Sequence, residues 1–516
     1  MRMANASHQA APDFGPEGLE RLTEREQQFE RIRRRLGFGM APAVFFLILA
    51  CPLPTLNPAA HRLGAIMAAV VVLWVCESIP MPVTALCGAA ACVIIRVADA
   101  KTVFAPFADP LMFLFIGSFM LARAIFLHGL DRRLAFGVLS MRWVGARPSR
   151  ILFSFGAVTA MASAWISNTA TTAMMFAIGM SILSFLFSDQ WAGASRLDRR
   201  YATGLMLMTS FAASIGGLAT PIGTPPNLIG LRYLREELGI EFPFFRWTLI
   251  GVPVVVVLFF YLHFYLNRFC PAGVREIEGS HEMLERERVR LGSWTPGQIS
   301  TLVAFLLTVM LWVVPGVLAL VLGDQNSTYR LVNACIPEAV PAVMGAALLF
   351  LLPGDEGARA ISWKQAAEID WGIILIYGGG FTLGVLAFDT GLAMAIGEGL
   401  TRIVPVQGDF GLLVASTCVA TLVSEATSNT ASANIVVPVV ISLAWALGLD
   451  PLQPALGATF GASLGFMLPV STPCNAIVYG SGYIPIGRMI RYGVLLDVAG
   501  VVVIVVLIRF LVPLVV

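Results

Sequence analysis

Charge is scarce in this sequence. Only 13% of its 516 residues are Asp, Glu, Lys or Arg, against roughly a quarter in soluble proteins. The net charge is +2, and no basic stripe with interleaved aromatic residues occurs, which argues against nucleic acid as a partner. The eight cysteines form no Cys-x-x-Cys pair, so a cysteine-based metal or redox motif is not expected, and they are interpreted as buried thiols.

Long apolar runs take the place of charge. Hydrophobic residues make up 57% of the chain, and stretches of about 18 or more apolar residues, each long enough to cross a bilayer core, recur from residue 37 onward. The chain is therefore predicted to be an all-α polytopic membrane protein. The first apolar run begins too late for a secretory signal. Four arginines at 31–35 precede that run, so a cytoplasmic N-terminus in the inner (cytoplasmic) membrane is expected.

Two apolar blocks are about twice as long as one spanning helix needs. Residues 151–188 contain no ionisable side chain, and Glu425 is the only charged residue in 410–449. Each block carries the same triplet at its centre, Ser167-Asn168-Thr169 and Ser428-Asn429-Thr430. Irregular backbone at membrane depth is tolerated where it lines a protein-walled cavity. Both blocks are therefore predicted to be re-entrant hairpins with the triplets at their tips.

The two blocks belong to an internal repeat. MASAWISNTATTAMM (161–175) matches LVSEATSNTASANIV (422–436), and TPIGTPPN (220–227) matches LPVSTPCN (468–475). Five membrane crossings are predicted between the two tips, and an odd number turns the second copy upside down. Inverted-topology repeats of this kind are typical of secondary transporters.

The repeated motifs combine donors for an anion with oxygens for a small cation. Helix N-termini offer unpaired N–H groups and partial positive charge to carboxylate or sulfate oxygens. Ser, Asn and Thr add neutral donors and acceptors. GTPP (223–226) and STPC (471–474) are each expected to place proline inside an apolar helix, where it frees nearby backbone carbonyls. Two cation sites flanking one shared anion site are predicted. A single such triplet is most often a helix N-cap; the repetition favours a binding site.

Other ionisable residues inside the apolar runs are interpreted mainly as braces between helices. These are Glu77, Arg123, Asp131 and Asp389. Glu425 is the exception, because it lies within four residues of Asn429. Neither motif contains Lys or Arg, so a bound dianion is expected to be balanced by helix termini and co-bound cations.

The paired triplets, the GTPPN and STPCN segments and WVCESIPMPVTAL (74–86) together resemble the divalent-anion:sodium symporter (DASS) family. Its INDY-type members carry C4-dicarboxylates, citrate and sulfate. The resemblance implies about eleven transmembrane helices plus two re-entrant helical hairpins in an inverted-topology repeat. It also implies a homodimer in which an elevator-type transport domain moves against a scaffold.

The resemblance also implies residue roles. The sodium ions would bind Ser163, Ser167, Asn168 and the Gly223 backbone in the first half, and Ser424, Ser428, Asn429 and the Ser471 backbone in the second. The substrate would bind Asn168, Thr169, Thr224, Asn429, Thr430, Thr472 and Pro473. Cys474 departs from the family, which usually has a second proline there, and this departure affects the expected shape of the second site.

The expected organisation follows from these assignments. A polar cytoplasmic tail (1–36) precedes first-half scaffold helices (37–145) and first-half transport elements (146–269: hairpin 151–188, broken helix 201–230, helix 246–269). A charged extramembrane linker (270–296) leads to second-half scaffold helices (297–405) and transport elements (406–516: hairpin 410–449, broken helix 454–483, helix 493–515). Single scaffold helices are predicted at 37–54, 62–80, 82–97, 106–128, 297–322, 334–353 and 372–396.

The expected function is sodium-coupled uptake of a C4-dicarboxylate such as succinate, with sodium as the co-transported ion. A dicarboxylate exchanger and a sulfate or citrate transporter of the same family are the near alternatives. An ion channel is a remote one, since a two-fold hairpin arrangement fits alternating access better than a continuous pore. An enzyme is not expected, because neither triplet has an evident catalytic base.

Overall fold

The computed structural model describes residues 24–53, 56–187, 198–277, 279–323, 325–401 and 408–515. Regular structure in this part is helical, apart from one isolated β-bridge between Pro353 and Arg359. The predicted all-α membrane class is confirmed. Nine described helical segments are long and apolar enough to cross a membrane, or ten if the bent pair α14–α15 is one span. The expected eleven spans stay a prediction.

The helices of the first half run to residue 269. They are α1 (Glu24–Ala50), α2 (Pro58–Cys76), α3 (Met81–Ile94), α4 (Ala100–Phe104), the 3₁₀ turn η1 (Ala105–Ala108), α5 (Pro110–Leu127), α6 (Leu130–Leu139), α7 (Pro148–Ser163), α8 (Asn168–Leu186), α9 (Arg199–Gly216), α10 (Pro225–Leu238) and α11 (Phe244–Phe269).

The helices that follow are α12 (Ser280–Arg290), α13 (Pro296–Leu322), α14 (Ser327–Cys335), α15 (Ala339–Leu349), the 3₁₀ turn η3 (Asp355–Gly357), α16 (Trp363–Ala366), α17 (Trp371–Asp389), α18 (Leu392–Thr401), α19 (Gly408–Ala426), α20 (Asn429–Ala446), α21 (Leu452–Gly461), α22 (Pro473–Tyr479) and α23 (Ile486–Val515).

Helix breaks stand at both Ser-Asn-Thr triplets. Ser167 and Ser428 have non-helical backbone and cap the helices that follow, α8 and α20, by accepting from the N–H groups of Ala170 and Ala431 at 3.4 and 3.2 Å. A hydroxyl at this position satisfies one of the orphan donors of a helix start. The triplets are therefore N-caps as well as candidate binding motifs.

The two predicted broken helices are interrupted for longer than a proline kink requires. Residues 217–224 separate α9 from α10, and residues 462–472 separate α21 from α22. The prolines were expected inside helices, and this was wrong. The first turn of α10 contains Pro225 and Pro226, and that of α22 contains Pro473. An N–H in the first turn has no carbonyl acceptor within the helix, so proline loses no helical hydrogen bond there.

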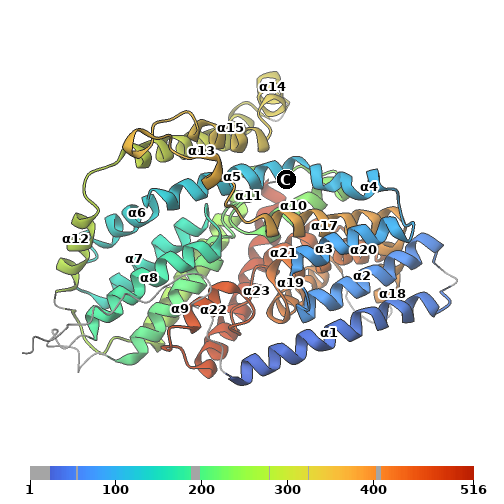
Figure 1. Cartoon of the computed structure of the whole chain (residues 1–516), viewed down its shortest axis with the longest axis horizontal. Coiled ribbons are helices and arrows are strands. Elements are labelled where there is room, and N and C mark those ends of the chain that lie inside the picture. The colour runs from blue at the N-terminus through green and yellow to red at the C-terminus, as the bar shows by residue number, and fades with distance from the viewer. Residues whose placement is uncertain are drawn as a thin grey trace, which may run out of the picture.

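Two sets of three helices flank a central pair of long helices. Figure 1 shows α7, α8 and α9 side by side on one side, and α19, α20 and α21 pack together on the other. The long helices α11 and α23 pack against each other between them. Glycines permit close approach here, because a Cβ at Gly251 or Gly493 would lie 2.4 or 2.3 Å from the carbonyl oxygen of Leu218 or Phe466. The central helices thus press directly on the two interrupted segments.

Several predicted boundaries were wrong for local reasons. The first helix begins at Glu24, so part of the expected tail is helical; residues 1–23 lie outside the described residues. The helix expected at 372–396 ends at Asp389, because Gly391 takes a left-handed backbone (φ 76°) before α18. The helix expected at 334–353 is the bent pair α14 and α15, whose axes differ by 52°. The predicted division into scaffold and transport domains stays a prediction.

Candidate transport site

The first tip brings together the side chains of Ser163 and Asn168. Ser163 is the last residue of α7 and is fully buried, and its Oγ lies 2.7 Å from Asn168 Oδ1 at the start of α8. The same amide atom is 3.1 Å from the carbonyl oxygen of Ala213 and 3.3 Å from that of Gly223. In one orientation of the amide, four oxygens face one another. In the other, the NH₂ group faces the remaining three oxygens as the hydrogen-bond donor, and this orientation satisfies both atoms of the amide.

The second tip repeats this arrangement with different carbonyl partners. Ser424 Oγ, at the end of α19, donates to Asn429 Oδ1 at 2.8 Å and contacts the carbonyl oxygen of Ala462 at 2.8 Å. Asn429 Nδ2 contacts the carbonyl oxygen of Ser463 at 3.4 Å. Each tip thus joins a serine, an asparagine and backbone carbonyls from an interrupted segment, and at the first tip also from the helix before it, into a cluster without formal charge.

A second pair of asparagines shapes the interrupted segments. Asn227 Nδ2 donates to the carbonyls of Gly217 and Thr220 at 2.9 and 2.8 Å. Asn475 Nδ2 donates to those of Gly465 and Leu468, both at 2.9 Å. Donor and acceptors keep the same sequence separation in both halves, and both asparagines are fully buried. Each segment is therefore fixed by one side chain that satisfies two of its carbonyls.

The two halves meet where α22 packs against α8 and α9. The thiol of Cys474 lies against the hydroxyls of Thr169, Thr172 and Ser214, and Ser210 Oγ donates to Asn475 Oδ1 at 2.6 Å. Reciprocally, α10 packs against α20 and α21. The first triplet and the second Thr-Pro segment are therefore neighbours in space.

The predicted substrate residues differ in accessibility. Thr169 and Pro473 are exposed, and Asn168, Asn429 and Thr430 are half-buried. Thr224 and Thr472 are buried, and Thr472 Oγ1 caps α22 by accepting from the N–H of Asn475 at 3.1 Å. Thr224 makes no such cap bond. α22 begins at Pro473, and Cys474 is the second residue of its first turn.

An open cleft of about 1190 Å³ lies along α8, and its lining includes Ala170, the residue that follows Thr169. One wall is a face of α8 from Ala170 to Ser184, and the other includes Arg123, Asp131 and Arg132 near the α5–α6 junction. Asp131 is 6% exposed, and burial raises its pKa to about 6. This wall carries charges of both signs, because Asp131 lies beside the two arginines and Arg123 pairs with Glu368.

Glu425 lies at the second tip with both carboxylate oxygens bonded. Oε1 accepts from the N–H of Met467 at 2.8 Å and Oε2 from Ser471 Oγ at 2.5 Å. Ser471 was predicted to contribute only its backbone to the second sodium site. In the structure its hydroxyl also donates to Glu425. In the first half the aligned position is Ala164, whose carbonyl accepts from Thr220 Oγ1. The second tip therefore holds its interrupted segment with a carboxylate and the first with a backbone carbonyl.

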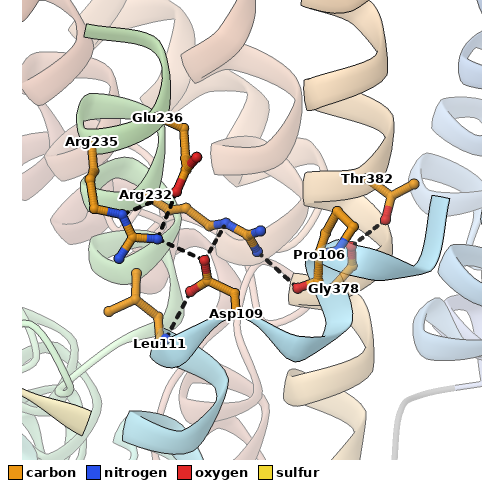
Figure 2. Close-up of polar contacts among 8 residues, drawn as sticks. All are labelled: Pro106, Asp109, Leu111, Arg232, Arg235, Glu236, Gly378 and Thr382. Carbon is orange, nitrogen blue, oxygen red and sulfur yellow. Dashed lines mark hydrogen bonds and ion pairs between the residues drawn. The ribbon is translucent and has the colours of Figure 1, made fainter. Parts of the chain in front are cut away.

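A buried ion cluster fixes α10 to the start of α5, as Figure 2 shows. Asp109 caps α5 through the N–H of Leu111 at 2.8 Å and pairs with Arg235 at 2.7 Å and Arg232 at 3.3 Å. The guanidinium of Arg232, which is 4% exposed, also donates to the carbonyl of Pro106 and lies 3.1 Å from the ring centroid of Phe381 on α17. Asp109 and Arg232 were not predicted to be important.

Two of the predicted braces form as expected. Glu77, in a left-handed conformation at the end of α2, pairs with Arg33 at 2.8 Å. Arg123 pairs with Glu368.

Comparison with known proteins decides the family. The family model described as "Sodium:sulfate symporter transmembrane region" matches residues 35–516. The chain belongs to this family. The resemblance seen in the motifs is thereby confirmed, and the protein is a multi-pass membrane transporter, not an enzyme.

The chain is similar in sequence to other transporters and similar in fold to two solved structures. The "Sodium-dependent dicarboxylate transporter SdcS" of Staphylococcus saprophyticus is 31% identical over 95% of this chain and 93% of its own length. An "Uncharacterized transporter" of Haemophilus influenzae is 32% identical over 89% and 94%. Among solved structures, the Alcanivorax borkumensis YdaH transporter (TM-score 0.52, 12% identity, covering 79% and 86%) and Neisseria gonorrhoeae MtrF (0.51, 11%, 96% and 96%) share the fold.

Proposed function

We propose that this chain is a secondary active transporter that couples uptake of a C4-dicarboxylate, such as succinate, to sodium. Relatives named as sodium-dependent dicarboxylate transporters support both the ion and the substrate class. The observation that carries the proposal is the repeated cluster of Ser, Asn and backbone carbonyl groups at the two tips. Sodium binds several neutral oxygens of this kind without needing a fixed negative charge.

Each tip has one surface that is complementary to a cation and another that is complementary to an anion. At the first tip, Asn168 Oδ1, Ser163 Oγ and the carbonyls of Ala213 and Gly223 form an oxygen cluster that a sodium ion would hold together. Asn168 and Thr169 begin α8, whose free N–H groups and positive dipole end favour a carboxylate. A bound cation therefore strengthens anion binding, and the two substrates are coupled.

The proposed cycle moves the transport elements as an elevator against the scaffold within a homodimer, in the cytoplasmic membrane with the N-terminus in the cytoplasm. The cleft that begins at Ala170 supports an approach to the first tip between α8 and the α5–α6 junction. Ser167, Ser428 and the Ser471 backbone complete the proposed sodium sites. Thr224, Thr430, Thr472 and Pro473 complete the substrate site.

Uptake into liposomes tests the proposal. Purified protein is expected to accumulate succinate only when a sodium gradient points inward. Uptake that ignores sodium but needs internal dicarboxylate would replace the symporter with an exchanger. Competition by sulfate and citrate would show whether the site prefers another dianion of the family.

Variants of the two tip asparagines test the site itself. Asn168→Ala and Asn429→Ala are each expected to abolish sodium-driven uptake, because each removes the amide shared by a cation and the anion. Asn326→Ala is the matched control, since Asn326 caps the exposed start of α14 through the N–H of Thr328 at 2.8 Å. Normal uptake by either tip variant, with the control also active, would exclude the shared-site arrangement.

A further inference from the structure

Two chain segments run side by side between the proposed scaffold and the proposed transport elements. One is α6, which joins α5 to α7, and the other is α12, which joins α11 to α13. The two helices pack against each other, near one end of the molecule in Figure 1. Ser280 and Leu284 of α12 are buried, so this charged helix is packed rather than free in solvent.

The scaffold ends of these two segments are bound to each other. The guanidinium of Arg133, in α6, donates to three successive carbonyls, those of residues 291–293, at 2.7, 3.1 and 2.9 Å. Its Cζ atom also lies 5.1 Å from the centroid of the Trp294 ring. A cation is favourable here, because the C-terminal end of a helix carries partial negative charge and free carbonyls. Arg133 therefore caps α12 from a neighbouring helix.

The chain that enters α6 and the chain that leaves α12 are fixed at the same place. Gln298 Nε2, in the first turn of α13, donates at 3.0 Å to the carbonyl of His128, which precedes Gly129 at the start of α6. The His128 ring is held by the Ala360 carbonyl, 2.6 Å from Nε2, and by Asp355 Oδ2, 3.2 Å from Nδ1. Both connections therefore leave the scaffold from one anchored point.

The transport ends of the two segments also meet. The N–H of Ile277, before α12, donates to the carbonyl of Ala146, before α7, at 2.7 Å. Ile277 is fully buried. A Cβ on Gly279, at the start of α12, would lie 3.3 Å from the ring of Phe185 in α8. Both connections thus arrive at α7 and α8 together.

Glycines with left-handed backbone flank both helices. Gly129 (φ 62°) and Gly145 (φ 55°) lie before and after α6, and Gly279 (φ 79°) and Gly292 (φ 65°) lie before and after α12. Glycine adopts this conformation without the steric cost that a Cβ brings. Hinges between rigid parts are commonly a few element-terminal residues of this kind, which absorb changes in φ and ψ. The pair of helices therefore has a glycine at each of its ends.

We propose that α6 and α12 form one rigid two-helix bar that pivots at these glycines as the transport elements move, and that Arg133 is the positioning residue that locks the two helices together. The proposal rests on the proposed function, since it assigns this movement to the transport cycle. Two helices fastened at both ends can tilt together, whereas a single hinged helix also allows the transport elements to twist. Arg133 does not line the cleft along α8, so its expected effect is on the rate of movement and not on binding.

Arg133→Gln tests the lock, because glutamine has neither the charge nor the forked donors that reach three carbonyls. Sodium-driven succinate uptake is expected to slow by about tenfold, the effect on the barrier of one lost hydrogen bond to a charged group. Succinate affinity in the presence of sodium should not change. Arg290→Gln is the matched control, since Arg290 pairs with Glu287 in the same helix, and it should behave as wild type. Uptake by Arg133→Gln at the wild-type rate, or a loss that lies entirely in affinity, overturns the proposal.

A covalent link between the helices tests whether they move as one body. Arg133→Cys/Ser293→Cys, with the exposed Cys51, Cys87 and Cys335 replaced by serine, is treated with a short bis-maleimide. The linked protein is expected to recover most of the wild-type rate, while the untreated variant stays slow. Linked protein that cannot transport would show that α6 and α12 must separate in each cycle, which contradicts the proposal.

Hydrogen exchange separates this inference from the proposed function, because it needs no knowledge of the substrate. In detergent, the backbone amides of residues 280–293 are expected to exchange about tenfold faster in Arg133→Gln than in wild type or Arg290→Gln. The cross-link should restore slow exchange. Equal exchange in all of these proteins overturns the bar, whatever the uptake assay shows. Faster exchange in Arg133→Gln, together with no succinate uptake by wild-type protein, would contradict the proposed function and support the bar.

Discussion

Removing the charge of Asp109 is expected to destabilise the protein through the arginine it leaves behind. Asp109→Asn keeps an acceptor for the N–H of Leu111, because Asn and Asp are comparable N-caps. It removes the carboxylate that pairs with Arg232 and Arg235. Arg235 is 31% exposed and still pairs with Glu236 at 2.8 Å. Arg232, however, is left buried without a carboxylate, beside the Pro106 carbonyl and the rings of Phe381 and Tyr377.

The magnitude follows from this geometry. Breaking a buried ion pair by removing one partner costs about 3–5 kcal/mol, and the remaining contacts of Arg232 place the expected loss near the lower end. Asp109→Ala also removes the N-cap, which adds about 1 kcal/mol. In Asp109→Asn/Arg232→Met no buried charge is left unpaired, so most of the lost stability should return.

Equilibrium unfolding in detergent micelles measures the series. The expected order of stability is wild type and double variant together, then Asp109→Asn, then Asp109→Ala. Equal stability of wild type and Asp109→Asn would show that the ion pair contributes nothing. A double variant less stable than Asp109→Asn would refute the argument that an unpaired Arg232 causes the loss.

Three further predictions concern other buried polar groups. Asp131→Asn should stabilise the protein by up to about 3 kcal/mol at pH 7 and leave its stability unchanged near pH 4. The reason is that burial raises the pKa of Asp131 from 3.8 to about 6, so the folded wild type loses stability as pH rises through that interval. Equal effects of the substitution at both pH values in thermal unfolding would refute this. Asn475→Ala should cost about 1–3 kcal/mol per carbonyl left unpaired and abolish uptake, and Asn475→Asp should not rescue either property, since it lacks the NH₂ group. Ser210→Ala should weaken stability by about 1 kcal/mol through the lost bond to Asn475, with Ser154→Ala on α7, also buried, as a neutral control.

The helix breaks at the two triplets could be predicted because their signals are local. A double-length run with at most one charged residue and a polar triplet at its centre predicts an interruption at the triplet. Ser163 and Asn168 are five residues apart, so the break itself brings them together. The family resemblance added roles for Gly223 and Ser471, which no local pattern marks.

What escaped prediction depends on contacts between distant elements. Ala213 joins the first cluster only because α9 packs beside α7 and α8, and an alanine in an apolar helix carries no signal of a useful carbonyl. The pairing of Asp109 with Arg232 and Arg235 joins residues more than a hundred positions apart, which periodicity along one helix does not reveal.

The measurement that tests the central claim most directly is succinate binding to the purified transporter by calorimetry, with and without sodium. Wild-type protein is expected to bind succinate only when sodium is present. Asn168→Ala and Asn429→Ala should each weaken binding strongly in sodium, because both tips contribute to one coupled site. Equal succinate affinity in the presence and absence of sodium, or unchanged sodium dependence in either variant, would contradict the account.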